Sequence, residues 1–292
     1  MHKTEDSRTC SGIFGSEHAG TKLQTENPGD LRALRGSPSH IDRCNILGVG
    51  VSAVNMTTAL QAIDGWIARR EPHYVCVTGV HGVMESQRDA ELRHIHNSAG
   101  LVTPDGMPLV WLSRARGFRS VGRVYGPDLM LRLCERSVAH AYRHYFYGGT
   151  EGVASTLAGR LSKRFAGLQV AGVYTPPFRP LTPEQDREIV DTINSTHPDI
   201  VWVGLSTPKQ ELWMAAHVDR LAAPVLVGVG AAFDFNTGLK HQAPAWMQRS
   251  GLEWLFRLVT EPRRLWRRYL VNNPSFVVLV ALQALGLRRY SL

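Results

Sequence analysis

The chain has 292 residues, of which 43% are hydrophobic and 20% are charged, and its net charge is +8. This composition predicts a full apolar core, in one large domain or in one domain with an appendage. Its four cysteines include no Cys-x-x-Cys pair, which argues against a zinc ribbon or a disulfide framework and favours a reducing compartment. The polar N-terminus does not resemble a signal peptide, and no apolar run reaches the roughly 18 residues of a spanning helix.

Residues 1–43 are rich in Ser, Thr, Gly, Pro and charged residues without apolar periodicity, which predicts a disordered leader. Over residues 44–248, short β-branched runs alternate with amphipathic stretches. Strands are expected at Ile46–Ala53, Tyr74–Val80, Leu101–Thr103, His144–Tyr147, Val170–Tyr174, Ile200–Leu205 and Val225–Val229. Helices are expected at Met56–Arg70, Gly82–Asn97, Asp128–Ala141, Gly152–Phe165 and Glu184–Ser195. The alternation predicts an α/β fold with a mostly parallel sheet covered on both faces.

Small polar loops follow several of these strands, at the sheet edge where such folds bind ligands. Asp105 lies in a Pro-Asp-Gly turn and is the best candidate for a general base, although a turn aspartate or a helix N-cap has the same pattern. Asp234 follows a later strand and carries the same two interpretations. Lys209 and Gln210 open a helix, where backbone N–H groups favour anions, or else form a solvated first turn.

Two kinds of cofactor site are disfavoured. Gly48-Val-Gly50-Val-Ser-Ala53 fits the dinucleotide pattern, but its glycines lie inside an apolar strand and no acidic residue ends the next strand. An NAD-dependent oxidoreductase is therefore only an alternative hypothesis. No His-Glu-x-x-His and no Asp-x-Asp occurs, so no metal site is predicted. Enzymes that use sugar nucleotides often hold the diphosphate through a metal ion on an Asp-x-Asp pair. If this chain used such a substrate, its side chains would have to neutralise the diphosphate.

Residues 249–292 form an Arg-rich segment with eight Arg, two Glu and no Lys or Asp, a net charge of +6. Guanidinium binds phosphate and diphosphate through paired donors. Aromatic residues such as Trp254, Trp266 and Tyr269 are interleaved with the arginines, a combination typical of phosphate binding at a membrane surface. A solvated helix face with core aromatics, or a non-catalytic membrane or nucleic-acid adaptor, is the alternative. The apolar run Phe276–Leu287 is interpreted as an interfacial helix, with a core or partner-binding helix as alternatives.

Four motifs in order resemble the WecG/TagA/CpsF glycosyltransferase family from about Asn45 to Arg268. They are Thr103-Pro-Asp-Gly-Met107, Gly204-Leu-Ser-Thr-Pro-Lys-Gln-Glu211, Gly228-Val-Gly-Ala-Ala-Phe-Asp-Phe235 and Ala243-Pro-Ala-Trp-Met-Gln-Arg-Ser-Gly-Leu-Glu-Trp-Leu-Phe-Arg-Leu258. The resemblance implies a Rossmann-like core of the GT-E type and a C-terminal helical appendage that completes the active site.

The resemblance also implies residue roles. Asp105 would be the general base, Thr78 would line the donor-sugar pocket, and Gln210 would orient the sugar or the acceptor. Three arginines of the appendage would close over the diphosphate, namely Arg257, Arg264 and Arg267. The family often has Thr-x-Asn where this chain has Thr78-Gly-Val-His81, so His81 is expected to substitute for the asparagine, and a contact to the donor is expected to change.

The implied activity is an inverting, metal-independent transfer of a sugar, N-acetylmannosamine in typical members, from its UDP form to a polyprenyl-diphosphate-linked N-acetylglucosamine. Another hexose or a uronic acid is an alternative donor. No cofactor and no nucleic acid is expected. The expected location is the cytoplasmic face of the cell membrane, held by anionic lipid, in the synthesis of a cell-surface polysaccharide. The oligomeric state is left open, with a homo-oligomer among the alternatives.

Overall fold

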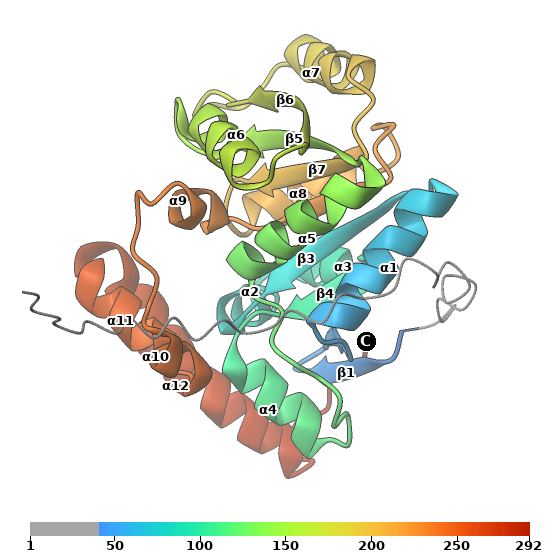
Figure 1. Cartoon of the computed structure of the whole chain (residues 1–292). Coiled ribbons are helices and arrows are strands. Elements are labelled where there is room, and N and C mark those ends of the chain that lie inside the picture. Colours follow the sequence, from blue (N-terminus) through green and yellow to red (C-terminus); the bar gives the residue numbers. More distant parts are fainter. Residues whose placement is uncertain (1–40) are drawn as a thin grey trace, which may run out of the picture. The chain divides into compact units, whose positions relative to one another are not determined.

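The computed structural model describes residues 41–292, so residues 1–40 of the predicted leader lie outside the described part. Six parallel strands form the central sheet in the order β4-β3-β8-β7-β5-β6 (Figure 1). They are β3 (His73–Thr78), β4 (Leu101–Pro104), β5 (Arg143–Gly148), β6 (Gln169–Tyr174), β7 (Ile200–Gly204) and β8 (Val225–Gly228). The predicted α/β class and parallel sheet are confirmed.

A separate antiparallel hairpin precedes the sheet and corrects one prediction. The run Ile46–Ala53 is not one strand: β1 (Arg43–Ile46) and β2 (Val49–Ser52) pair with each other across Leu47 and Gly48. Both turn residues have positive φ, 52° and 81°, as a two-residue hairpin turn requires. The glycine pattern of the dinucleotide motif therefore lies in a hairpin and not at a strand-to-helix junction.

Helices cover both faces of the sheet and explain why its inner strands β7 and β8 are apolar on both sides. One face packs against α1 (Met56–Arg69), α5 (Gly126–His140), α6 (Val153–Arg164) and α9 (Ala232–Asn236). The other packs against α2 (Val80–Glu85), α3 (Ala90–Ser98), α4 (Met107–Ala115), α7 (Pro183–Ser195) and α8 (Lys209–His217). Alternating residues of β7 serve the two cores: Trp202 is fully buried on one face and Val203 on the other.

The predicted helix Gly82–Asn97 is two helices, α2 and α3. Asp89 separates them, because its side chain accepts hydrogen bonds from the backbone N–H of Glu91 (2.9 Å) and Leu92 (3.1 Å) and so caps a new helix. The expected single helix is therefore divided into two short helices.

The Arg-rich segment folds as three helices: α10 (Ala245–Arg249), α11 (Glu253–Thr260) and α12 (Pro262–Ala284). Pro262 begins α12 and so separates it from α11; in the first turn of a helix the missing N–H of proline costs no hydrogen bond. Phe276 of α12 is buried against the sheet-side core, so part of the run Phe276–Leu287 packs on the protein. No helix within residues 41–292 is long and apolar enough to cross a membrane.

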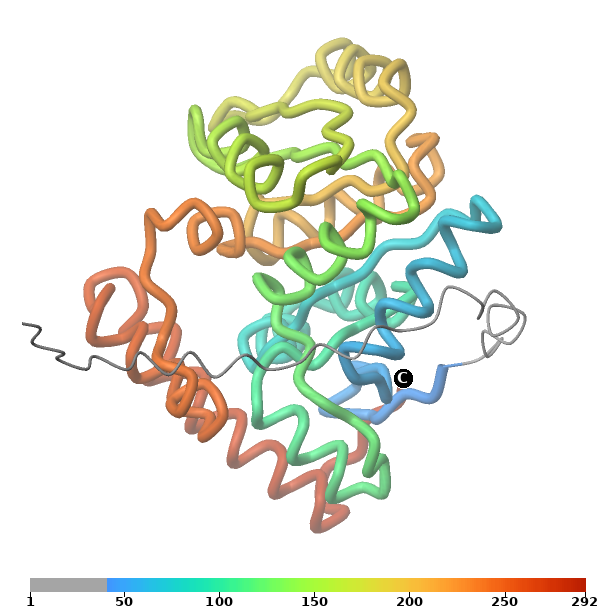
Figure 2. The backbone as a smooth tube through the Cα atoms, in the orientation of Figure 1, coloured from blue at the N-terminus to red at the C-terminus, as the bar shows by residue number. Residues whose placement is uncertain are grey.

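The end of α12 returns to the hairpin, as the red end of the trace in Figure 2 shows. Gln283 accepts hydrogen bonds from the Leu47 backbone N–H (3.2 Å) and from Arg116 (2.8 Å), and donates one to the Asn45 carbonyl (3.2 Å). Asn45 also donates to the Tyr290 carbonyl at 2.8 Å. These hydrogen bonds fix the C-terminal end of α12 to the α/β core.

Candidate active site

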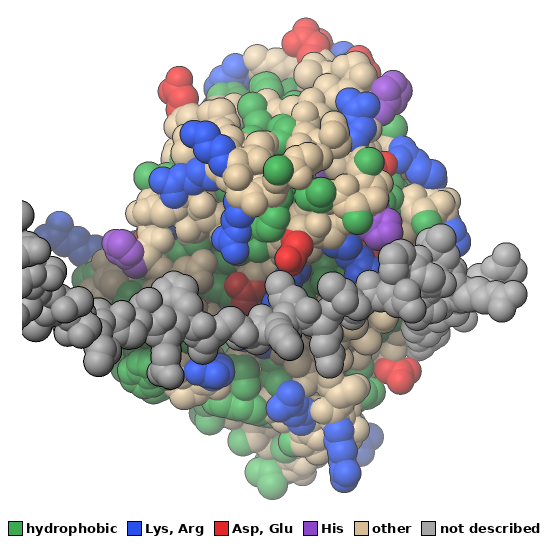
Figure 3. Space-filling model, viewed as in Figure 1, with side chains coloured by type: hydrophobic (Ala, Val, Ile, Leu, Met, Phe, Trp, Pro, Cys, Tyr) green, Lys and Arg blue, Asp and Glu red, His purple; other side chains and the backbone are tan. Residues whose placement is uncertain are grey.

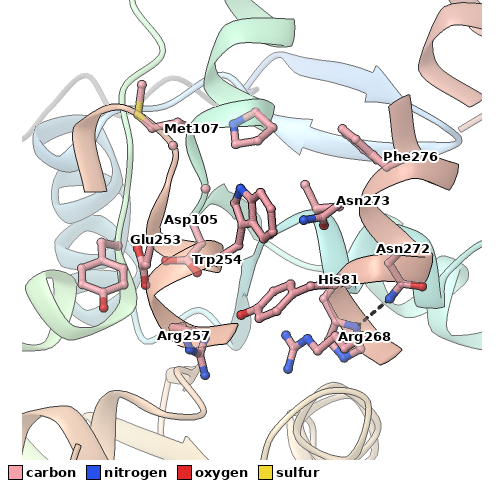
Figure 4. Close-up of a pocket in the computed structure, with 18 of the residues that line it drawn as sticks. His81, Asp105, Met107, Glu253, Trp254, Arg257, Arg268, Asn272, Asn273 and Phe276 are labelled. Carbon is pink, nitrogen blue, oxygen red and sulfur yellow. Dashed lines mark hydrogen bonds between the residues drawn. The ribbon is translucent and has the colours of Figure 1, made fainter. Parts of the chain in front are cut away.

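A cavity of about 980 Å³ lies at the carboxyl ends of the strands, closed on its other side by α11 and α12 (Figure 4). Loops after four strands reach it: 79–82 after β3, 105–108 after β4, 206–207 after β7 and 229–232 after β8. The convergence of these loops at one sheet edge is therefore confirmed, as expected for parallel strands.

Asp105 lies in the wall of this cavity and is held by two backbone hydrogen bonds. Its N–H donates to the Thr78 carbonyl (3.0 Å), and its Oδ1 accepts from the Gly126 N–H (3.2 Å). Burial raises the pKa of Asp105 to about 6, with Glu253 adding to the rise and Arg123 opposing it. A carboxylate with that pKa is mostly ionised at neutral pH and still basic enough to take a proton.

Arg123 connects the Asp105 loop to the C-terminal helices, a role that no local sequence signal marks. Its guanidinium donates to the Asp105 carbonyl and pairs with Glu253 of α11. A third donation reaches Gln248 at 3.1 Å, and the guanidinium lies 4.1 Å from the ring centroid of Tyr125. Docking of α10 and α11 is thereby coupled to the position of the candidate base.

Arginines of the C-terminal helices supply positive charge to the cavity. Arg257, Arg264 and Arg268 line it, whereas Arg267 is exposed and lies outside the lining. The Nε atoms of Arg257 and Arg268 are buried without a hydrogen-bond partner among the described residues. Burial lowers the pKa of Arg268 to about 10, so its side chain remains charged at neutral pH. An anion in the cavity would give these guanidinium groups the partners they lack.

Thr78 is the last residue of β3 and His81 lies in the first turn of α2, and the two side chains face different surroundings. His81 lines the cavity and contacts Asn272 of α12 (Nδ1 to Nδ2, 3.4 Å; Figure 4). Burial, and then the charge of Arg268, lowers the pKa of His81 to about 3, so the ring is neutral at physiological pH. Thr78 is buried and lies outside the cavity lining, and its hydroxyl lies 3.1 Å from Nε2 of His96. The Thr78 carbonyl accepts the hydrogen bond from the Asp105 N–H.

Gln210 is buried and lines the cavity. Its amide donates to Glu211 at 3.0 Å, while its Oε1 has no partner among the described residues. Lys209, beside it, is exposed and lies outside the lining. Gln210 therefore brings an acceptor without a described partner to the cavity wall.

Asp234 also lies outside the lining and belongs to a chain of ion pairs. Asp234 pairs with Lys240 at 2.8 Å. Lys240 also lies 3.5 Å from Glu261, and Glu261 pairs with Arg264 at 2.8 Å. The chain connects α9 to the first turn of α12. Over residues 41–292, no three His, Cys, Asp or Glu side chains are grouped as metal ligands.

Comparisons with known proteins identify the family of this chain. The profile of the glycosyl transferase WecG/TagA/CpsF family matches residues 44–290. An N-acetylglucosaminyldiphosphoundecaprenol N-acetyl-beta-D-mannosaminyltransferase of Bacillus spizizenii is 32% identical over 196 residues, 67% of this chain and 74% of that protein. One of the same name from Bacillus subtilis is 30% identical over 194 residues, 66% of this chain and 73% of that protein. The chain belongs to the WecG/TagA/CpsF family and is a glycosyltransferase.

Proposed function

We propose that the protein transfers N-acetylmannosamine from its UDP form to a polyprenyl-diphosphate-linked N-acetylglucosamine. The observation that carries this proposal is one cavity that holds a carboxylate with a pKa of about 6, Asp105, together with the arginines 257, 264 and 268. The names of the two Bacillus relatives supply the sugar and the lipid-linked acceptor.

The chemistry is a single displacement with inversion. The acceptor hydroxyl oxygen bonds to the anomeric carbon of the donor, its proton passes to the Asp105 carboxylate, and the bond from that carbon to the diphosphate oxygen breaks. UDP leaves with the bonding electrons. One base and a stabilised leaving group are enough, because no glycosyl-enzyme intermediate forms that would need a second carboxylate.

Charge compensation for the departing UDP is assigned to arginine. Arg257 is partly buried, its Nε has no partner among the described residues, and it faces the same cavity as Asp105. Arg264 lines the mouth, and Arg267 lies one residue before Arg268, where it adds positive potential from outside. Charge-assisted contacts of this kind stabilise the transition state more than the bound substrate. We therefore propose that transfer needs no metal ion.

Recognition of the donor sugar is assigned to Gln210 and His81. The neutral His81 ring offers one donor and one acceptor to sugar hydroxyl or acetamido groups. Thr78 contributes indirectly, because its carbonyl holds the Asp105 amide. Lys209 and Asp234 act from outside the lining, Asp234 through its ion pair with Lys240. Because His81 differs from the asparagine common in the family, another UDP-hexose or a uronic acid is the second candidate donor.

The location proposed is the cytoplasmic membrane surface. Apolar residues of α10–α12 and of the residues that follow expose more than half of their surface, namely Trp246, Val259, Trp266, Leu270, Val277, Val278, Leu285, Leu287 and Leu292. Figure 3 shows hydrophobic side chains gathered at the lower left, over the region of α10–α12. Exposed arginines lie among them, including Arg263, Arg267, Arg288 and Arg289. Apolar insertion combined with attraction to anionic lipid is the usual basis of such peripheral binding.

One experiment tests the function. The protein is incubated in EDTA with a panel of UDP-sugars and a short polyprenyl-diphosphate-N-acetylglucosamine analogue, and products are identified by mass. We expect one added N-acetylhexosamine with UDP-N-acetylmannosamine and none with the Asp105→Asn variant at matched times. Product from a different UDP-sugar alone would replace the donor assignment. No product from any donor, with a folded protein, would contradict the proposal.

A further inference from the structure

The cavity-facing side of α12 changes in character along its length. Positions four residues apart lie on one face of a helix. The positions in this row that line the cavity are Arg268, Asn272, Phe276, Val280 and Ala284. The row begins with a cation, continues with an amide and ends with three apolar residues. Val277 and Ala281, beside the row, line the cavity as well and extend its apolar half.

The facing wall of the apolar half comes from α4 and the turn before α11. Met107, Pro108, Trp111 and Leu112 of α4 line it. The Trp111 ring packs over Gly251, where a Cβ atom would approach within 2.7 Å of the ring, and Gly251 has a φ of +72°. A glycine there lets the tryptophan close one side of the groove. Among the described residues that line the apolar half of the cavity, none is charged.

This apolar half suits an aliphatic chain and not a nucleotide or a sugar. Uracil, ribose and pyranose groups carry many hydrogen-bonding atoms, which would lose water here without gaining partners. The floor is Phe276, which is only 5% exposed, whereas Val277 at the rim is 66% exposed, so the groove is open along one side. Because Ala281 and Ala284 have small side chains, the groove is not filled by the protein itself.

We propose that the groove between α4 and α12 binds the first isoprene units of the acceptor's polyprenyl chain, with the acceptor diphosphate at Arg268 and Asn272. This inference rests on the proposed function and assigns the lipid subsite within it. Arg268 and Asn272 lie where the polar and apolar halves meet, so a diphosphate held there directs the sugar toward Asp105 and the chain along α12. The stretch from Asn272 to Ala284 spans about 18 Å of helix, room for several isoprene units.

The test varies acceptor chain length in solution, without membranes or detergent. Acceptors are N-acetylglucosamine diphosphates that end in a methyl group or in one, two or three isoprene units. For the unmodified protein, kcat/KM should rise with each unit that the groove covers. Ala281→Phe fills the groove and should lower kcat/KM for the longest acceptor by about tenfold or more, from lost burial of its carbons. Its rate with the methyl acceptor should change by no more than about twofold, because the polar half is untouched.

Val278→Phe is the matched control, since Val278 is on the same helix, is 57% exposed and lies outside the lining. It should keep the full dependence on chain length. Retention of that dependence in Ala281→Phe, or its equal loss in both variants, would overturn the proposal. Turnover of the methyl acceptor with no gain from isoprene units would reject the groove but leave the proposed function intact.

Binding supplies a second readout that needs no turnover. Farnesyl diphosphate should bind more tightly than inorganic diphosphate by calorimetry, and Ala281→Phe should remove the difference. Absence of transfer to every acceptor would reject the proposed function. Equal binding of the two diphosphates by the unmodified protein would reject the groove.

Discussion

The ionisation of Asp105 should determine how kcat/KM falls at acid pH, which is the acid limb of the pH–rate profile. Burial raises its pKa from the usual 3.8 to about 6, which corresponds to about 3 kcal/mol in favour of the neutral form. About nine-tenths of the enzyme is then ionised at pH 7 and about one-tenth at pH 5. Because the base must be ionised to accept the acceptor's proton, kcat/KM should fall about tenfold between these values. His81 does not contribute, since its pKa of about 3 lies below this window.

The assay is the initial rate of product formation from pH 4.5 to pH 8 at constant ionic strength. Asp105→Asn should lower turnover by about 10²–10⁴-fold and abolish the limb. Asp191→Asn is the control, because Asp191 is exposed on α7, away from the cavity. A limb near pH 6 that persists in the residual activity of Asp105→Asn would show that another group titrates, and the assignment of the base would fail.

Further predictions concern charge around the same carboxylate. Glu253→Gln should move the acid limb to lower pH, because Glu253 raises the pKa of Asp105, and an unmoved limb would contradict that coupling. Arg257→Gln should lower kcat by about 10²-fold while Arg263→Gln, exposed and outside the cavity, should not, as single-turnover rates would show. Activity should survive EDTA; its loss on chelation and return with Mg²⁺ would refute charge compensation by arginine. Asp105→Asn should raise the unfolding temperature at pH 8 but not at pH 3.5, because a raised folded-state pKa costs stability only above the unfolded value.

The strands were predictable because both faces of the sheet are covered, which requires continuous apolar runs. The hairpin was missed for the same reason. Leu47 is fully buried although it occupies a turn, so the turn adds no polar residue to the run, and only Gly48 marks it. The separation of α2 from α3 depended on Asp89, whose capping role competes with an uninterrupted amphipathic pattern. Local sequence was thus ambiguous where one residue decided between two backbone paths.

The sequence predicted the loops that follow the strands in the site. It did not predict which side of each C-terminal helix faces the cavity. Counting from Arg257 would place later arginines on one continuous helix. A new helix begins at Pro262, and its rotation is set by packing of Leu265 and Phe276 on the core. Arg268 consequently lines the cavity, while Arg267 points outside its lining. Arg123 gave no local signal at all, because its partners lie up to 130 residues away in sequence.

The last prediction concerns the anchoring of α12, on which both the polar and the apolar halves of the cavity depend. Gln283 is the side chain that joins the end of α12 to the hairpin, through Leu47, Asn45 and Arg116. Gln283→Ala would leave the buried Leu47 N–H without its partner. Such a loss costs about 2 kcal/mol, slightly offset by the better helix propensity of alanine.

For a chain of this size, about 2 kcal/mol lowers the unfolding temperature by roughly 4–8 °C. Gln61→Ala is the matched control, an exposed glutamine of α1 with no described hydrogen bond, and it should leave the unfolding temperature nearly unchanged. Calorimetry of both variants gives the comparison. If Gln283→Ala unfolded at the same temperature as Gln61→Ala, these hydrogen bonds would not fix α12, and the groove it forms with α4 would have to be held by the packing of buried α12 residues such as Leu265 and Phe276.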